Sequence, residues 1–169
     1  GLSTRVEVSG GAMQINGEET EAGAELFVAA LSQLGDTGAL ASDVNTSDFP
    51  AEALYENVSL VTGFTPDPYL VSIVAGGDSA ASDELGAACA GNVTSKQPDV
   101  VLNYTAGANF GLYLYAEAAE DTTLILLGPD GWYCDDDSHG DFNPGVSLER
   151  PLSGDYLIWV GTFDGGVAD

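Results

Sequence analysis

Short runs of β-forming residues, separated by turn residues, make up most of the chain from residue 64 onward. Valine, isoleucine, leucine, threonine and aromatic residues fill the runs, and glycine, proline or aspartate residues stand between them. The strands predicted in this way are residues 69–74, 100–104, 112–115, 122–127, 146–149 and 156–162. Short strands at this spacing are typical of an antiparallel β-sandwich or jelly roll, so we predict a mainly β fold.

The first 63 residues have a different pattern, and they are predicted to form an N-terminal extension (1–63) to the sandwich at 64–169. Residues 4–9 alternate between apolar and polar side chains, as a half-buried strand does, and residues 12–16 could pair with them in a hairpin. Residues 18–34 are predicted to form a helix, although the apolar run at 26–28 would equally suit a buried strand. Residues 48–54 carry the capping aspartate and the early proline of a second, short helix.

The 169-residue chain has a net charge of −24, because 27 acidic residues face only 3 lysine and arginine residues. So few cations cannot form the basic surface that phosphate backbones or anionic membranes require, and we expect no nucleic-acid partner. The charge instead favours divalent cations, a basic partner or a saline habitat. No apolar run approaches the roughly 18 residues of a membrane-spanning helix.

The densest group of acidic residues lies at 128–144, between two predicted strands. Neighbouring carboxylates repel one another by about 1 kcal/mol per pair in water, so an ordered loop of this kind needs a compensating cation. Oxygen ligands suit calcium, and the loop lacks the bidentate glutamate of an EF-hand. A calcium site in a β-loop and a solvated acidic turn therefore stay open. The predicted calcium ligands are Asp130, Asp135, Asp136, Asp137, Asp141 and Asn143.

The chain contains two cysteines, Cys89 and Cys134, and this even number predicts one disulfide in an oxidising compartment. Two free buried thiols are the alternative, and metal ligation is disfavoured because no CxxC or HxxxH spacing occurs. The sequence begins at Gly1, so we expect an exported chain whose signal peptide has been removed, with a trimmed chain as the alternative.

Four N-glycosylation sequons are present, where one chance match would be expected. Their asparagines are Asn45, Asn57, Asn92 and Asn103. Chance matching is the alternative, since many organisms do not use the sequon.

The residue pattern gives no support to catalysis. The only histidine, His139, lies among aspartates that favour its charged form, which is a poor base at neutral pH. A GxSxG motif is absent, and neither cysteine has a basic neighbour that would lower its pKa. Acidic residues are too numerous for any two to be singled out as a glycosidase pair. The aromatic residues could form a binding platform, but we expect most of them in the core.

The second half of the chain carries a recognisable order of motifs. The strand at 122–127 is followed by Pro129-Asp130-Gly131, the acidic loop, Asn143-Pro144, and a closing strand that begins Ser153-Gly154-Asp155-Tyr156. Roughly residues 64–165 thereby resemble the bacterial pre-peptidase C-terminal (PPC) domain, a secreted β-sandwich. The resemblance implies a non-catalytic module of extracellular proteins, and calcium binding as in related collagen-binding modules. The sequence departs from the family in stopping at residues 165–169, where a further short strand would be expected, and this departure predicts an unpaired sheet edge.

Together these features predict a secreted, calcium-stabilised β-sandwich that acts as an extracellular structural subunit or binding module. The strand at 4–9 is predicted to complete the open edge of a neighbouring copy, so that copies join head to tail in a filament. The expected partners are other copies of the chain, or an extracellular protein or polysaccharide. The alternatives are an accessory substrate-binding domain of a secreted peptidase or hydrolase, and a carbohydrate-binding surface adhesin.

Overall fold

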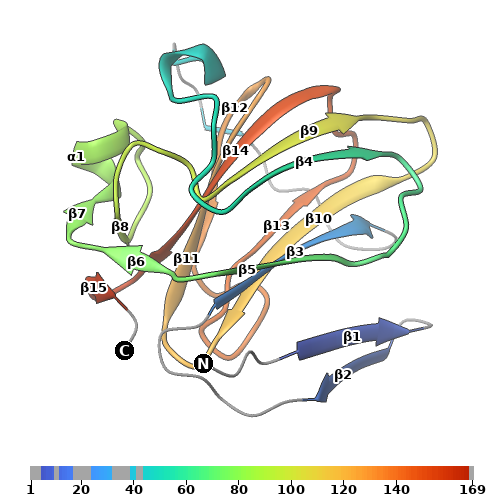
Figure 1. Cartoon of the computed structure of the whole chain (residues 1–169), viewed down its shortest axis with the longest axis horizontal. Helices are drawn as coiled ribbons and strands as arrows, with labels where there is room; N and C mark the ends of the chain where they lie inside the picture. The colour runs from blue at the N-terminus through green and yellow to red at the C-terminus, as the bar shows by residue number, and fades with distance from the viewer. Residues whose placement is uncertain (1–4, 10–11, 17–23, 32–38, 41–43, 168–169) are drawn as a thin grey trace.

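The computed structural model describes residues 5–9, 12–16, 24–31, 39–40 and 44–167, and their fold is mainly β, as predicted. Two larger sheets face each other and share a buried core in a sandwich-like arrangement (Figure 1). The four-stranded sheet has the order β13 (Gly145–Leu148), β10 (Gly111–Ala118), β3 (Ala24–Leu31) and β5 (Tyr69–Ile73). The seven-stranded sheet contains β12 (Gly131–Asp135), β11 (Thr122–Gly128), β14 (Gly154–Thr162), β9 (Val100–Thr105) and β4 (Glu56–Val61), with β8 (Asn92–Val93) and β7 (Ser79–Ala80) continuing from the end of β14.

Shorter elements lie around these sheets. The hairpin of β1 (Arg5–Ser9) and β2 (Ala12–Asn16) forms an antiparallel sheet of its own, which stands at the bottom of Figure 1. β6 (Gly76–Gly77) pairs with β15 (Gly166–Val167), so the C-terminal segment contributes a paired strand at the place where an unpaired edge was expected. The described helices are the 3₁₀ helix η1 (Thr46–Asp48) and the short α1 (Ala81–Leu85).

The core between the two sheets follows from strand alternation. On β10, Leu112 and Leu114 are buried between the sheets, whereas Tyr115 belongs to a separate cluster on the outer face. Leu126 of β11 and Ile158 of β14 meet them from the facing sheet. Burial of such apolar side chains, worth about 25 cal/mol per Å², holds the layers together.

A second buried cluster covers the outer face of the seven-stranded sheet. Ile125 and Leu127 of β11 pack there with Trp159 of β14 and with Ala81 and Leu85 of α1. β11 is therefore buried on both faces. This explains why its sequence is a nearly continuous apolar run instead of an alternating one.

The helix predicted for residues 18–34 is wrong, because residues 24–31 form β3 between β10 and β5. The rest of that range lies outside the described residues. Leu26, Phe27 and Val28 are all buried, since both faces of β3 are covered. A continuous apolar run fits a doubly buried strand as well as a helix, and here the strand forms.

The short helix predicted for residues 48–54 is also wrong, and only η1 forms in this region. The Asn57 side chain accepts a hydrogen bond from the Ala53 N–H at 2.8 Å and donates one to the Ala51 carbonyl at 3.0 Å. The Leu54 N–H donates to the Pro98 carbonyl at 2.8 Å. Backbone groups that a helix would pair with one another are thus used elsewhere.

Each strand predicted from residue 64 onward is present, and the predicted N-terminal hairpin pairs as β1 and β2. Besides the two-residue strands β6, β7, β8 and β15, two longer strands lie outside the predicted ranges. β12 occupies the start of the acidic segment, and β4 pairs in parallel with β9, so the larger sheet is mixed. β3 and β4 also tie residues from the first 63 positions into both larger sheets.

Tyr156 fixes the turn that leads into β14. Its hydroxyl donates to the carbonyl oxygen of Leu152, four residues earlier, at 2.8 Å, and its ring is 1% exposed. A tyrosine that bonds back across the corner before its own strand is typical of Greek-key sandwiches. This contact accounts for the tyrosine in the Ser153-Gly154-Asp155-Tyr156 motif.

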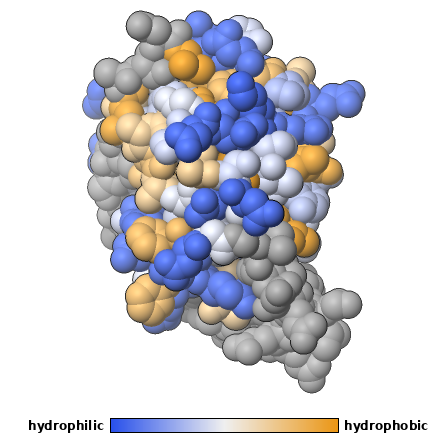
Figure 2. Space-filling model, turned by 90° about the vertical axis from the view of Figure 1, so that its left-hand side faces the viewer, coloured by the Kyte–Doolittle hydropathy of each residue, from blue (hydrophilic) through white to orange (hydrophobic). Residues whose placement is uncertain are grey.

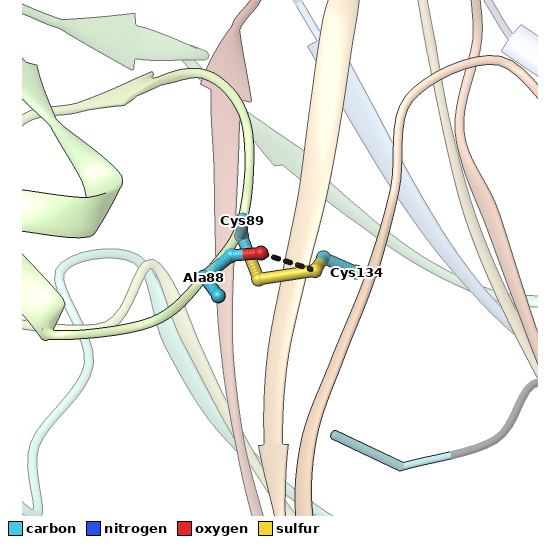
Figure 3. Close-up of a disulfide and its surroundings, with 3 residues drawn as sticks. All are labelled: Ala88, Cys89 and Cys134. Carbon is cyan, nitrogen blue, oxygen red and sulfur yellow. Dashed lines mark hydrogen bonds between the residues drawn. A yellow bond between two sulfur atoms is a disulfide. The ribbon is translucent and has the colours of Figure 1, made fainter. Parts of the chain in front are cut away.

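The predicted disulfide between Cys89 and Cys134 is present and joins the segment after α1 to the end of β12 (Figure 3). The Cα atoms are 5.8 Å apart, within the usual range for a disulfide. The Cys134 sulfur also lies 3.9 Å from the Ala88 carbonyl oxygen. The disulfide thereby fixes the covering segment, which is α1 and the residues after it up to Cys89, to β12 at the edge of the seven-stranded sheet.

The surface mixes hydrophilic and hydrophobic residues. Figure 2 shows the side that carries α1 and β7, where hydrophilic residues interrupt the hydrophobic ones. Within the described part of the chain, no helix is long and apolar enough to cross a membrane.

Candidate functional site

Asp135, at the end of β12, organises the acidic loop. One of its carboxylate oxygens accepts hydrogen bonds from the Ser138 N–H at 2.8 Å and the Gly145 N–H at 2.9 Å. Its other oxygen accepts one from the Ser138 hydroxyl at 2.5 Å. Gly145 begins β13, so a single carboxylate joins the last residue of one strand to the first residue of the next. Hydrogen bonds to an ionised acceptor are stronger than neutral ones, so this carboxylate closes the loop.

Two other predicted ligands also bond to the protein itself. The Asn143 side-chain oxygen accepts a hydrogen bond from the Ala118 N–H at 2.9 Å, and its amide donates to the Asp141 carbonyl at 3.2 Å. The Asp130 carboxylate accepts one from the Tyr133 hydroxyl at 2.6 Å. These contacts hold the loop against β10 and complete the turn between β11 and β12.

Asp136 and Asp137 lie near two carboxylates that were not predicted from the sequence. The pKa of Asp121 is raised by burial first, and then by the charges of Asp164, Asp136 and Asp137. Asp121 precedes β11, and Asp164 follows β14, so the two come together through strand pairing. No local sequence pattern could have predicted this neighbourhood.

The described residues contain no group of three or more His, Cys, Asp or Glu side chains placed to share a metal ion. The six predicted calcium ligands are therefore not gathered into one oxygen shell here. Asp135, Asp130 and Asn143 already accept hydrogen bonds from protein donors. Calcium binding at the acidic loop stays a prediction.

His139 connects the loop to the outer face of the four-stranded sheet. Its Nδ1 lies 2.7 Å from the Tyr113 hydroxyl, and its Nε2 lies 3.0 Å from the Glu117 carboxylate. Burial, with the nearby charges of Asp135 and Glu117, raises the pKa of Tyr113 to about 12. The phenol therefore keeps its proton at neutral pH and can donate it to Nδ1, while Nε2–H bonds to Glu117.

Stacked rings continue this contact into the sheet. The His139 ring stacks on Tyr115 with centroids 4.2 Å apart, and Tyr115 stacks on Phe27 of β3 at 4.5 Å. Tyr113, Tyr115 and Glu117 occupy every second position of β10, and this spacing is the sequence signal that a polar and aromatic face exists. The partner of that face, His139, is more than twenty residues away and was not predicted. The whole arrangement fastens the loop.

The loop tip has an unusual backbone. Asp141 and Phe142 have φ values of 54° and 60°, in the left-handed region that costs non-glycine residues about 1–2 kcal/mol each. The Phe142 side chain is 65% exposed. Hydrogen bonds from the His139 N–H to the Asn143 carbonyl and from the Asn143 N–H to the Gly140 carbonyl, both at 3.0 Å, hold the tip in this conformation.

A shallow polar hollow of about 260 Å³ lies near the opposite end of β12 and β13. It is lined by Asp130, Tyr133, Leu148, Glu149 and Arg150. Two carboxylates and one guanidinium could contact a small polar group, but the hollow holds no histidine or cysteine for acid–base or nucleophilic chemistry.

The glycosylation candidates lie at or near the surface. Asn45, Asn57 and Asn103 are exposed, and Asn92 is half-buried. The amide of Asn103 donates to Asp155 at 2.8 Å, and that of Asn57 bonds to the backbone of the preceding loop. Glycosylation stays a prediction at all four positions.

The expectation that aromatic residues pack in the core is confirmed for most of them. Trp132, Tyr133, Tyr115 and Trp159 are 1–5% exposed, and Tyr113 is half-buried. Their rings therefore do not form an exposed platform.

Comparison with protein-family models, curated proteins and solved structures finds no match to the chain. The resemblance to the PPC domain stays a prediction.

Proposed function

We propose that this chain is a non-catalytic, exported structural subunit that associates with further copies of itself. The main support is the amphipathic β1–β2 hairpin, which pairs with none of the other described strands. An isolated two-stranded hairpin is marginally stable in water and gains stability when another sheet or layer covers it. A subunit that carries such a hairpin has a ready element for assembly.

Export is supported by the Cys89–Cys134 disulfide, because disulfides persist mainly in oxidising compartments. A structural role is supported by the acidic loop, whose His139 nitrogens and Asp135 oxygens contact other protein groups. These groups fasten the loop and leave little free chemistry for a reaction.

Calcium is proposed as a stabilising ion at Asp136 and Asp137. Its support is the negative charge gathered near Asp121, whose pKa is raised first by burial and then by the charges of Asp164, Asp136 and Asp137. A divalent cation there would relieve the repulsion between neighbouring carboxylates.

Sedimentation velocity of the whole chain in concentrated sodium chloride tests self-association. The expected result is a weight-average mass that rises with protein concentration above that of one chain. A single-chain mass at every concentration, with and without calcium, would contradict the proposed function and favour an accessory or adhesive module.

A further inference from the structure

β4 is the edge of the larger sheet that is least protected against pairing. Among the described strands it pairs only with β9, and its other side has no partner strand. Natural edge strands are usually protected by lysine, proline or a bulge. The sequence of β4, Glu-Asn-Val-Ser-Leu-Val, contains neither lysine nor proline, and its only charged side chain, that of Glu56, accepts a hydrogen bond from Tyr69 of β5.

The other edge strands longer than two residues in the two larger sheets, β12, β5 and β13, are better protected against pairing than β4. At β12, Leu40 already donates a backbone hydrogen bond to the Trp132 carbonyl at 2.6 Å. At β5, Pro68 immediately precedes the strand, and Pro66 lies two residues before Pro68. All residues of β13 are buried.

The direction of the backbone groups of β4 follows from one hydrogen bond. The Thr62 N–H, just after the strand, donates to the Thr105 carbonyl of β9 at 2.9 Å. Successive residues of a ladder direct their backbone groups to opposite sides, so Ser59 and Val61 point theirs away from β9. Ser59 and Val61 are also exposed, Val61 at 58%. This side of β4 therefore offers donors and acceptors to another strand.

The β1–β2 hairpin has the matching pattern. Its register pairs Val6 with Ile15 and Val8 with Met13, which places these four apolar residues on one face of the ribbon. Polar residues, among them Arg5, occupy the other positions. β4 alternates in the same way, with Val58 and Leu60 buried toward the core and Ser59 on the outer face.

We infer that β4 of one copy receives the β1–β2 hairpin of a second copy, which extends the seven-stranded sheet across the interface. This assignment rests on the proposed function and names its contact surfaces. The apolar face of the hairpin continues the inner layer formed by Val58 and Leu60. It also covers the exposed side chains of Tyr55 and Val74. These two residues are neighbours, because the Tyr55 hydroxyl donates a hydrogen bond to the Val74 carbonyl at 3.4 Å.

Charge and position favour a second copy as the occupant. Arg5 is one of the 3 basic residues of the chain, and β4, β9 and β14 contain none, whereas β14 carries Asp155 on its exposed side. Within one chain the hairpin stands at the bottom of Figure 1 and β4 near the top, with β5 between them. The β1–β2 hairpin therefore reaches the free edge of β4 in another copy more readily than the β4 of its own chain. Repeating this head-to-tail contact produces an open filament.

Ser59→Pro tests the receiving edge, because proline removes the outward N–H and is tolerated on an edge strand where that N–H faces solvent. Ser59→Thr is the matched control, since threonine keeps the N–H. In sedimentation velocity of the whole chain, the Pro variant should fall to the mass of one chain, and the Thr variant should behave as the unaltered chain. Val61→Lys adds an edge-protecting charge without touching the core, and it should also abolish assembly even if the Pro variant misfolds.

Val8→Asp tests the hairpin, because it places a charge on the apolar face. The Val8→Asp chain keeps β4, and the Val61→Lys chain keeps the hairpin. Each alone should be monomeric, and an equimolar mixture should form a two-chain species that cannot grow further.

The outcomes separate the two proposals. Assembly by the unaltered chain that survives Val61→Lys and a folded Ser59→Pro would overturn the β4 assignment and leave self-association intact. A monomeric unaltered chain would overturn both. A mixture that stays monomeric, although each parent variant has lost assembly, would overturn the pairing of hairpin with β4.

Discussion

Among single residues, Asp99 carries the clearest electrostatic consequence. It lies just before β9 and is 5% exposed, and its carboxylate accepts a hydrogen bond from the Val160 N–H at 2.8 Å. Burial raises its pKa from 3.8 to about 7, and the Val160 hydrogen bond only partly opposes this shift. Below about pH 7 the folded protein therefore favours the protonated, neutral form of Asp99.

Asp99 should make the folded protein less stable as the pH rises. Because the pKa of Asp99 is higher in the folded state, the folded protein binds this proton more tightly than the unfolded chain does. The stability gained from this tighter binding is complete below about pH 4 and is lost as the pH rises through about 7. At about 1.4 kcal/mol per pKa unit, the loss amounts to roughly 4 kcal/mol. Asp99→Asn, which is neutral and can still accept the Val160 hydrogen bond, should therefore exceed the unaltered chain in stability by a margin that grows between pH 4 and 8. Urea unfolding across this range measures the margin, and a constant difference would contradict the raised pKa.

At the scale of elements, the Cys89–Cys134 disulfide fixes the covering segment to β12. The two cysteines are 45 residues apart, and closing a loop of this length restricts the unfolded chain by about 4 kcal/mol in the chain-entropy model. Replacing both cysteines by alanine should lower the free energy of unfolding by about 2–4 kcal/mol. Thermal and denaturant unfolding measure this loss. An unchanged free energy of unfolding would contradict this prediction, because it would mean that the disulfide does not limit the conformations of the unfolded chain.

The acidic loop gives a second prediction for the elements, because Asp135 holds the loop together by hydrogen bonds whereas Asp137 adds negative charge near Asp121. Asp135→Ala should lower the melting temperature without any cation, since it removes the bonds to Ser138 and Gly145. Asp137→Ala should leave the calcium-free melting temperature unchanged or raise it, because it relieves repulsion. Calcium should raise the melting temperature of the unaltered chain, since an ion that binds only the folded state stabilises it, and Asp137→Ala should reduce this increase.

Magnesium at equal concentration is the control for the calcium measurement. An equal response of the unaltered chain to both ions would indicate general screening of charge. No response to either ion would contradict the calcium site.

The elements differ in how well the sequence predicts them. Apart from β12, the strands from residue 69 onward that are longer than two residues, namely β5, β9, β10, β11, β13 and β14, follow from local runs and turns, and the disulfide follows from the number of cysteines. The sequence of β3 fits a helix as well as a strand, because its three adjacent apolar residues are buried on both sides and show no alternation. β4 does alternate, and that pattern could have predicted it. The contacts of His139 with Tyr113 and Glu117 depend on packing between distant segments, which no local pattern contains.

For the whole molecule, the net charge of −24 opposes both folding and association. Added sodium chloride screens this repulsion, with a Debye length that falls from about 10 Å at 0.1 M to about 3 Å at 1 M. The melting temperature and the extent of self-association should therefore both rise with salt. Asp136→Asn combined with Asp137→Asn should weaken the salt dependence of melting, while a chain indifferent to salt would contradict this reasoning.

In the proposed assembly, copies of this chain join by adding the β1–β2 hairpin to the edge of β4. Hydrogen–deuterium exchange in concentrated sodium chloride, at low and at high protein concentration, is the sharpest test of this pairing because it reports on the backbone groups themselves. We predict that exchange slows at high concentration in residues 5–16 and 56–61 together. Association that leaves the amides of 56–61 exchanging at the same rate would contradict the claim.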